Sequence, residues 1–255
     1  MPRKIIRIPG KAGRSSGAMT VNYQQVHMAL LALANPSKAA FLAGFFKTGK
    51  GQYAEGDRFL GISVPAIRQL ARQFRQLDLK SCECLLQSPY NEERLLALLI
   101  LVGHYRCGDD GIKNMVYRIY LKNRQHVNNW NLVDSSAPHV VGSHLLQQDR
   151  SLLYELSQSR SLWDRRIAML ATFAFIRAND FADALKLTEL FLTDEHDLMH
   201  KACGWMLREV GKRNQTVLES FLRRHHRVMP RTMLRYAIER FDSARRNAYL
   251  TGKIR

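Results

Sequence analysis

Apolar residues recur at helical spacing along almost the whole chain from about residue 21. Segments of roughly ten to seventeen residues carry apolar side chains three and four positions apart, and short polar or Gly/Pro stretches separate them. Strand-like alternation is scarce. Three such segments are Asn91–Tyr105, Ser161–Arg177 and His196–Lys212, and in the first two Asn91 and Ser161 are expected to act as N-caps.

The starts of these segments, near residues 91, 126, 161 and 196, lie about 35 residues apart, which is typical of stacked helical pairs. The sequence therefore predicts an all-α fold, an α-solenoid of HEAT-like helical pairs, with a compact all-α bundle as the alternative. Letter-for-letter similarity between the repeats is absent. We expect a single helical domain over residues 19–255, preceded by a flexible basic arm over residues 1–18. A transit peptide is the alternative for that arm.

Positive charge is concentrated at the two ends of the chain. The net charge is +17, yet residues 1–54 contain eight Lys/Arg and no Asp/Glu, and residues 201–255 contain fourteen Lys/Arg against four Asp/Glu. The middle of the chain is therefore close to neutral. This distribution favours an extended polyanion held by two parts of one fold. The alternative is a generally basic protein with nonspecific affinity for RNA.

The cysteines and the hydropathy of the chain predict its cellular compartment. Four cysteines without a CxxC pair are expected to be reduced and structural, and no apolar run reaches the ~18 residues that cross a bilayer. We expect a cytoplasmic, nucleoid-associated monomer with no membrane contact.

The first segment that could carry chemistry is VNNWNLVDSSAPHVVG, residues 127–142. Trp130 and Asp134 are four residues apart, so a helix places them on one face. An indole beside a fixed carboxylate is the functional interpretation. A core Trp and an Asp that caps a neighbouring helix is the alternative.

The second segment is Ser161–Arg177. Arg166 lies in line with an apolar stripe of Leu162, Leu170 and Phe173, so its guanidinium needs a carboxylate or phosphate partner. An ion pair with a carboxylate on an adjacent helix is the alternative to a phosphate contact. Arg165 is expected on a different, solvated side.

The third segment is MHKACGWMLREVGK, residues 199–212. Its buried face is predicted to contain Met199, Ala202, Cys203, Met206 and Val210. On a separate face Trp205 is accompanied by three cations, Lys201, Arg208 and Lys212. An indole that packs on a sugar or base while cations bind phosphates suits a nucleic-acid surface. An internal cation–π contact on a solvated helix is the alternative.

These segments together resemble the AlkD-type DNA alkylation repair family. The motifs NWNLVDS, LWDRRIAML and KACGWMLREVGK occur in order, and FLGISVP precedes them at residues 59–65, so the resemblance covers about residues 35–240. It implies a HEAT-like solenoid whose concave face binds duplex DNA, and a glycosylase that releases 3-methyladenine and 7-methylguanine.

By motif, the resemblance makes Asp134 the catalytic carboxylate and places Trp130 and Trp205 beside the damaged nucleotide. It places Arg166 near the DNA backbone, with Arg165 as a possible substitute. It implies no metal and no cofactor. The pair His196 and His200, four residues apart, has no carboxylate or cysteine partner at ligand spacing.

The sequence departs from the family pattern at two places. Asn129-Trp130 stands where some members have paired Trp, and Phe45 and Phe46 stand where an N-terminal helix can present a Tyr. The second change removes a hydroxyl that could contact phosphate, so lesion affinity is in question.

One carboxylate without a partner acid limits the substrates that this site could serve. Breaking an N-glycosidic bond develops positive charge on the deoxyribose, which a nearby carboxylate and indole faces stabilise. A base that is already cationic leaves as a neutral purine and needs no protonation. The sequence thus predicts activity on cationic alkylated purines and poor activity on neutral lesions. A noncatalytic helical scaffold that binds nucleic acid or protein is the rival interpretation.

Overall fold

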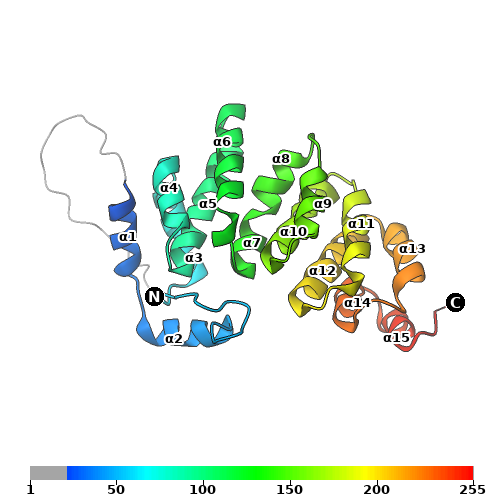
Figure 1. The fold of residues 1–255 in the computed structure, drawn as a ribbon. Helices are drawn as coiled ribbons and strands as arrows, with labels where there is room; N and C mark the ends of the chain where they lie inside the picture. Colours follow the sequence, from blue (N-terminus) through cyan, green and yellow to red (C-terminus); the bar gives the residue numbers. More distant parts are fainter. Residues whose placement is uncertain (1–21, 255) are drawn as a thin grey trace, which may run out of the picture.

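The computed structural model describes residues 22–254, and it confirms the prediction of an all-α solenoid (Figure 1). The predicted basic arm, residues 1–18, lies outside the described part. The α-helices are α1 (Tyr23–Leu31), α2 (Pro36–Phe45), α3 (Val64–Gln73), α4 (Leu79–Leu86), α5 (Asn91–Cys107), α6 (Asp110–Lys122), α7 (Trp130–Ser136), α8 (Ser143–Leu145), α9 (Ser151–Ser157), α10 (Leu162–Arg177), α11 (Ala182–Leu190), α12 (Asp197–Arg213), α13 (Gln215–His225), α14 (Arg231–Ala237) and α15 (Ser243–Thr251).

The helices form two rows that follow the chain. The first row consists of helices that each pack against the next: α3, α5, α7, α10, α12 and α14. The second row packs against the first and consists of α4, α6, α9, α11 and α13. The array bends into an arch, with α2 and α14 low at its two sides and α7 higher between them (Figure 1). This stacking in order brings segments about 35 residues apart side by side, as the helix spacing predicts.

The predicted cap at Ser161 is confirmed, whereas the one at Asn91 is wrong. The Ser161 side chain accepts a hydrogen bond from the Asp164 backbone N–H, at 3.4 Å. The N-cap position of α5 is instead Tyr90, and Asn91 is buried within the first turn. Its amide takes part in a buried polar network that local sequence spacing does not reveal.

The helix that begins with α7 changes its winding at Pro138. A five-residue π-helix, Pro138–Gly142, joins α7 to α8, and the Gly142 N–H bonds to the Ala137 carbonyl. Proline has no N–H to continue the α-helical ladder, so a wider turn accommodates it. The winding changes one turn after Asp134.

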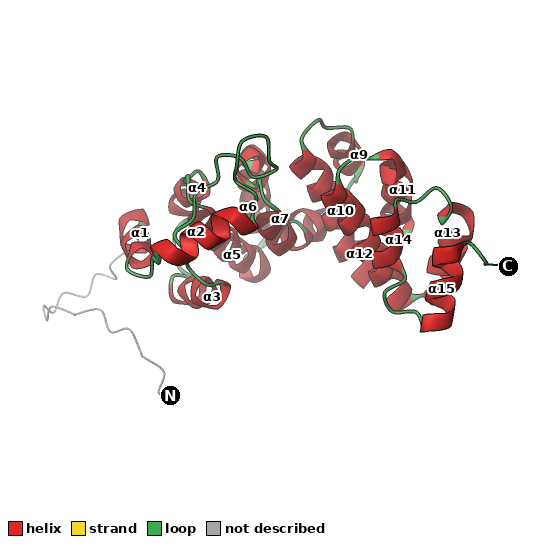
Figure 2. Ribbon diagram, turned by 90° about the horizontal axis from the view of Figure 1, so that it is seen from below, coloured by secondary structure: helices red, strands yellow, loops and turns green. Residues whose placement is uncertain are grey.

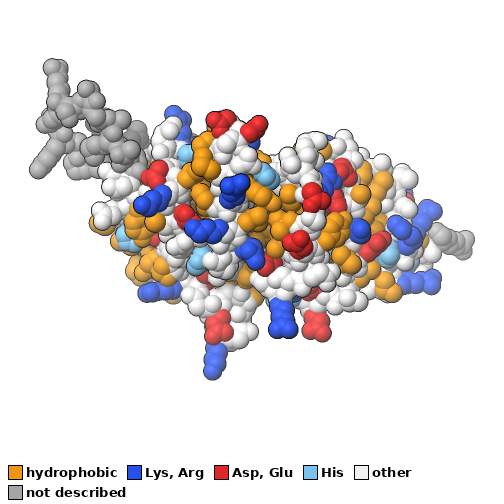
Figure 3. Space-filling model, turned by 45° about the horizontal axis from the view of Figure 1, so that its top comes forward, with side chains coloured by type: hydrophobic (Ala, Val, Ile, Leu, Met, Phe, Trp, Pro, Cys, Tyr) orange, Lys and Arg blue, Asp and Glu red, His pale blue; other side chains and the backbone are white. Residues whose placement is uncertain are grey.

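One continuous hydrophobic core runs along the array from Val26 to Tyr249. Its members include all five residues predicted for the buried face of 199–212. The four cysteines are unpaired, and of these Cys82 and Cys203 are buried while Cys84 and Cys107 are exposed. With its top turned forward, the surface shows acidic and basic side chains interspersed with apolar ones, so no patch of a single charge marks that side (Figure 3).

Within residues 22–254 no single helix is long and apolar enough to span a membrane. The bent pair α1 and α2 passes the same test together on length and composition, with an angle of 96° between the two helices.

His139, in the π-helical turn, makes the stability of the fold dependent on pH. Burial, together with Arg106 and Arg177, lowers the pKa of this imidazole to about 4. Between pH ~6.5 and ~4 the unfolded chain therefore binds more protons at this site than the folded protein. The full range corresponds to about 3 kcal/mol, and solvent screening reduces it because the side chain is only partly buried. We therefore expect the free energy of unfolding to fall by about 2 kcal/mol from this group as the pH drops through that range, and His139→Gln to remove that part. Urea denaturation of the parent and of His139→Gln at pH 7 and pH 4.5 measures this contribution. If the two proteins lose the same free energy of unfolding between these pH values, the assignment to His139 is contradicted.

Candidate active site

A groove of about 660 Å³ opens on the array where α7, α10, α12 and α14 lie in sequence. All four residues predicted as catalytic line it: Trp130, Asp134, Arg166 and Trp205. Its remaining lining residues are Phe45, Lys47, Tyr53, His196, Asp197, Leu198, Lys201, Arg208 and Tyr236. Three sequence segments that are separate along the chain therefore meet at one place.

Asp134 and Arg166 form a bidentate ion pair at the floor of the groove. The guanidinium donates from Nε to Oδ1 and from Nη2 to Oδ2, both at 2.8 Å. The Arg166 side chain is 5% exposed and that of Asp134 is 20% exposed. The Arg166 Nη1 also donates to the Leu198 carbonyl at the start of α12. Fork-to-fork pairing fixes the orientation of a carboxylate plane, so the exposed edge of Asp134 is held facing the groove.

Of the two interpretations of Arg166 that the sequence left open, the structure shows the ion pair with a carboxylate on an adjacent helix. Arg166 does pair internally, and its partner is the candidate catalytic carboxylate itself. The expectation that Arg165 is solvated is wrong. Its Nε donates to Asp194 at 2.7 Å, its Nη1 donates to the Ser159 and Arg160 carbonyls, and the side chain is 19% exposed. Arg165 does not line the groove.

Trp130 is held by a stack of aromatic rings behind it. It lies nearly parallel to Phe46, with ring centroids 5.0 Å apart, and Phe46 stacks in turn on Phe59 at 4.9 Å. The edge of Phe45 meets the indole at 6.1 Å. Aromatic contacts of this kind add to the stability that buried area provides. They also fix the indole one helical turn from Asp134.

Trp205 belongs to α12 and lies on the same groove, half-buried. Its indole N–H donates to Glu209 at 3.1 Å, and its ring packs beside Phe173 with centroids 6.0 Å apart. Gly204, the residue before it, allows α12 to approach α14 closely, because a Cβ there would lie 2.5 Å from the Met233 carbonyl oxygen and from the Tyr236 Cβ. This close approach brings Tyr236 to the groove next to Trp205.

The cations that the sequence predicts on the face of Trp205 do not all lie at the groove. Lys201 and Arg208 line the groove, whereas Lys212 does not. Each has an acidic partner on the protein: Lys201 bonds Asp197 at 2.7 Å, Lys212 bonds Glu209 at 2.7 Å, and Arg208 bonds Glu239. Such partly exposed pairs contribute little to stability, so they can be exchanged for phosphate contacts.

Several groove residues were not predicted from the sequence, among them Lys47, Tyr53, Asp197 and Tyr236. Lys47 follows the end of α2 in a left-handed conformation, φ 58°, and Tyr53 comes from the loop between α2 and α3. The Tyr53 ring meets the edges of Trp163 and His196, at 6.0 and 6.4 Å. Tyr53 and Tyr236 therefore bring phenol groups to the site, whereas the aromatic residues of the neighbouring helix α2 are all Phe.

His196 also lines the groove, and its side chain is half-buried. It caps α12, where its Nδ1 accepts the Leu198 N–H at 3.1 Å. Burial, with Arg165 nearby, lowers its pKa, so the ring is neutral near pH 7. No group of three His, Cys, Asp or Glu suited to a metal ion occurs within residues 22–254.

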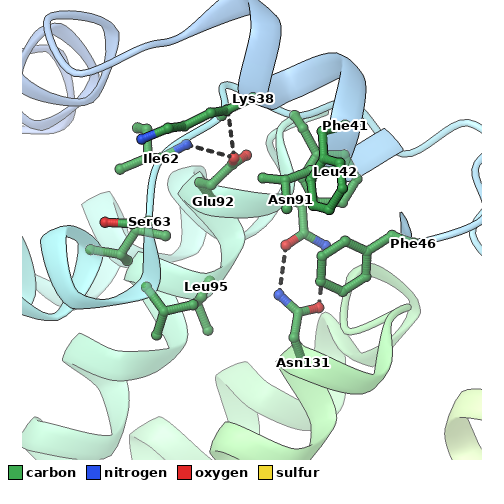
Figure 4. A pocket seen from close by; sticks show the side chains of 14 residues that line it. Lys38, Phe41, Leu42, Phe46, Ile62, Ser63, Asn91, Glu92, Leu95 and Asn131 are labelled. Atoms are coloured by element: carbon green, nitrogen blue, oxygen red, sulfur yellow. Dashed lines mark hydrogen bonds between the residues drawn. The ribbon is translucent and has the colours of Figure 1, made fainter. Parts of the chain in front are cut away.

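A buried polar network positions α7, and with it Trp130 and Asp134. The Asp57 carboxylate forms an ion pair with Arg94. It also accepts hydrogen bonds from the side-chain amides of Asn91 at 3.0 Å and Asn129 at 2.9 Å. Asn129 is the N-cap of α7, since its side chain accepts the Trp130 N–H at 2.8 Å. On the other side of Trp130, Asn131 donates to Asn91 at 2.7 Å (Figure 4). Both asparagines of NWNLVDS therefore anchor the helix.

Comparisons with known proteins agree with the fold. The family model described as DNA alkylation repair enzyme matches residues 26–241. The fold is similar to a solved structure described as a predicted DNA alkylation repair enzyme from Enterococcus faecalis, with a TM-score of 0.65 and 18% sequence identity over 82% of this chain and 97% of that one. No curated protein matches the sequence at a significant level.

Proposed function

Because the chain belongs to the DNA alkylation repair enzyme family, we propose that it is a DNA glycosylase that excises cationic alkylated purines, such as 3-methyladenine and 7-methylguanine, from duplex DNA. The observation that carries this proposal is the Asp134 carboxylate, fixed by Arg166 in a groove that Trp130 and Trp205 also line. The family establishes DNA as the substrate; the reaction and the adducts are the proposal.

The proposed reaction requires stabilisation of a positive charge on the deoxyribose and a water molecule that attacks C1′. As the C1′–N bond breaks, its electron pair goes to the alkylated purine, which leaves neutral, and positive charge develops on the deoxyribose. The exposed edge of Asp134 stabilises that charge and orients a water molecule, whose oxygen bonds to C1′ and whose proton passes to the carboxylate or to solvent. The negative faces of the two indoles favour both the sugar cation and the cationic base.

The second carboxylate of the groove is poorly suited to act as an acid. Asp197 bonds Lys201 at 2.7 Å, and although burial acts in the opposite direction, hydrogen bonds from Lys201 and Thr232 lower the pKa of its carboxyl group. It is therefore ionised at neutral pH and has no proton to give to a leaving base. This supports the restriction to bases that carry their own positive charge.

Incubation with methylated duplex DNA, followed by chromatography of released bases and counting of abasic sites, tests the proposal. We expect release of 3-methyladenine and 7-methylguanine and no release of a neutral lesion such as hypoxanthine. Binding of the duplex with no base released would instead support the rival function, a noncatalytic nucleic-acid-binding scaffold.

The groove cations are expected to contribute to affinity for all duplexes. Lys201→Gln and Arg208→Gln should each weaken binding of damaged and undamaged DNA alike, and should reduce the slope of log K against log salt by about 0.9 for each phosphate that the protein no longer neutralises. Lys212→Gln, outside the groove lining, should have the smaller effect. Titrations by fluorescence anisotropy at several salt concentrations measure this. Identical slopes in the parent and in the first two variants would show that this face does not bind DNA.

A further inference from the structure

Helix α2 exposes two neighbouring phenylalanine rings to solvent. Phe41 is 70% exposed and Phe45 is 54% exposed, and their rings stack with centroids 6.3 Å apart and 15° between planes. Lys38 precedes Phe41 by one turn and is also exposed, so these three side chains form one stripe, which we call the α2 stripe. No residue of α2 itself is buried. Single exposed apolar residues are ordinary, but a stacked pair of exposed aromatic rings on one helix is a candidate interaction site.

The α2 stripe leads directly into the candidate active site. Phe45 lines the groove and touches the edge of Trp130. Phe41 lines a separate apolar pocket of about 340 Å³, which Phe46 also lines (Figure 4). Aromatic surface therefore continues from the indole beside Asp134 outward along α2. A molecule bound in the groove and extending toward α2 would meet Phe45 first and Phe41 next.

Although it is exposed, α2 is firmly anchored at its N-terminal end. The Asn35 N–H bonds to the Leu60 carbonyl at 2.8 Å. Gly61, at φ 81°, permits this approach, since a Cβ there would lie 2.1 Å from the Asn35 carbonyl oxygen. The Glu92 carboxylate accepts the backbone N–H groups of residues 60–62 at 2.9, 2.9 and 3.2 Å, and Glu92 and Ile62 are labelled in Figure 4. The stripe is thus presented on a fixed support, as a binding surface requires.

The charges around α2 favour a polyanion with flat apolar faces. Lys38 lies on the stripe and Lys47 follows the end of the helix, and neither forms an ion pair with any residue between 22 and 254. Residues 1–54 contain no Asp or Glu. Aromatic rings beside cations suit nucleic acid, because bases and sugars offer apolar faces between phosphates. Viewed from below, α2 lies across the other helices in the foreground (Figure 2).

We propose that the α2 stripe is a second contact with the DNA duplex, beside the damaged nucleotide, and that Phe41 is its principal residue. Phe41 packs on the base or deoxyribose faces that become accessible next to the lesion when the duplex is distorted, while Lys38 and Lys47 bind the adjoining phosphates. This rests on the proposed function for the position of the lesion, and it assigns to α2 the recognition of distorted duplex.

Binding, not base release, tests this contact. The probes are two duplexes of one sequence, one undamaged and one carrying a tetrahydrofuran abasic-site analogue with 2-aminopurine next to it. We expect Phe41→Ala to weaken binding of the analogue duplex about 10-fold, as removal of one aromatic ring from beneath a base does, with a smaller effect on the undamaged duplex. It should also remove the 2-aminopurine fluorescence change that the parent produces. Phe41→Tyr, which keeps a flat ring, should bind as the parent does.

Val228→Ala is the matched control. Val228 is 66% exposed, close to the exposure of Phe41, and lies in the turn after α13. This variant should bind both duplexes like the parent, and thermal unfolding should be unchanged in all three variants because the side chains are exposed. Equal affinity of Phe41→Ala and parent for the analogue duplex would overturn the proposal. So would weaker binding of Phe41→Ala to anionic phosphatidylserine vesicles with its DNA affinity unchanged, which would make the stripe a membrane contact.

The outcome is separable from that of the proposed glycosylase function. If the parent releases no alkylated base while Phe41→Ala binds the analogue duplex more weakly, the glycosylase proposal fails and the α2 contact stands. If the parent releases base and Phe41→Ala binds normally, the α2 contact fails alone.

Discussion

Asp134→Asn is expected to lower the rate of alkylated-base release at least 100-fold while leaving affinity for duplex DNA within about twofold. The large effect on rate follows from losing the negative charge that we propose stabilises the sugar cation, a class of change that costs about 10²–10³ in rate. The small effect on affinity follows because phosphate contacts dominate duplex binding. Single-turnover release of 7-methylguanine, together with anisotropy titrations, measures both quantities.

The neighbouring ion pair supplies a matched control for this substitution. Asp194 pairs with Arg165 at 2.7 Å, as Asp134 pairs with Arg166, but it does not line the groove. Asp194→Asn therefore also removes a carboxylate from an arginine of α10 while leaving the groove carboxylate in place. We expect Asp194→Asn to release base at a rate near that of the parent. If Asp134→Asn releases base as fast as the parent, Asp134 is not the catalytic group; if both variants lose activity equally, the defect lies in the packing of α10.

Asp57→Ala is expected to reduce the free energy of unfolding by about 3–5 kcal/mol. Its ion pair with Arg94 is almost completely buried, with side-chain exposures of 3% and 4%, and removing one partner leaves a buried charge without compensation. The substitution also removes the hydrogen bonds that Asn91 and Asn129 make to this carboxylate. Because Asn129 caps α7, we expect base release to fall as well, even at temperatures where the protein is folded.

Chemical denaturation with circular dichroism measures the stability of this variant. Asp110→Ala serves as the comparison, since the Asp110 side chain is 95% exposed and, among residues 22–254, pairs only with Lys113 across one helical turn. It should change the free energy of unfolding by less than about 0.5 kcal/mol. A similarly small change in Asp57→Ala would mean that the network does not stabilise α7.

Helical spacing was enough to predict those parts of the site that lie within one helix. Trp130 and Asp134 share a face because they are four residues apart, and the buried face of 199–212 follows from the same period. The partner of Arg166 could not be predicted in this way, because the choice between phosphate and carboxylate depends on which helix packs beside α10. The resemblance to a family placed these residues together; the structure supplied the ion pair.

The missed and misassigned residues each have their own physical reason. Tyr53 reaches the groove from a loop, where no period relates a residue to a face, and its neighbours Trp163 and His196 are more than 100 positions away in the sequence. Asn91 was misassigned because a residue type that favours caps also satisfies buried carboxylates. Lys212 has the correct spacing on α12, yet its place near the end of the helix takes it past the groove.

The Arg166 guanidinium touches three successive helices, since it lies on α10, holds Asp134 of α7 and bonds the Leu198 carbonyl of α12. It therefore connects three neighbouring helices of the array. Any change in curvature that slides α7 or α12 past α10 must shift the carboxylate or stretch these bonds. Insertions in the loops beside α4, α6, α9, α11 and α13 should be tolerated. A residue added within α7, α10 or α12 would instead rotate the contacting group by about 100° about the helix axis and disrupt the site.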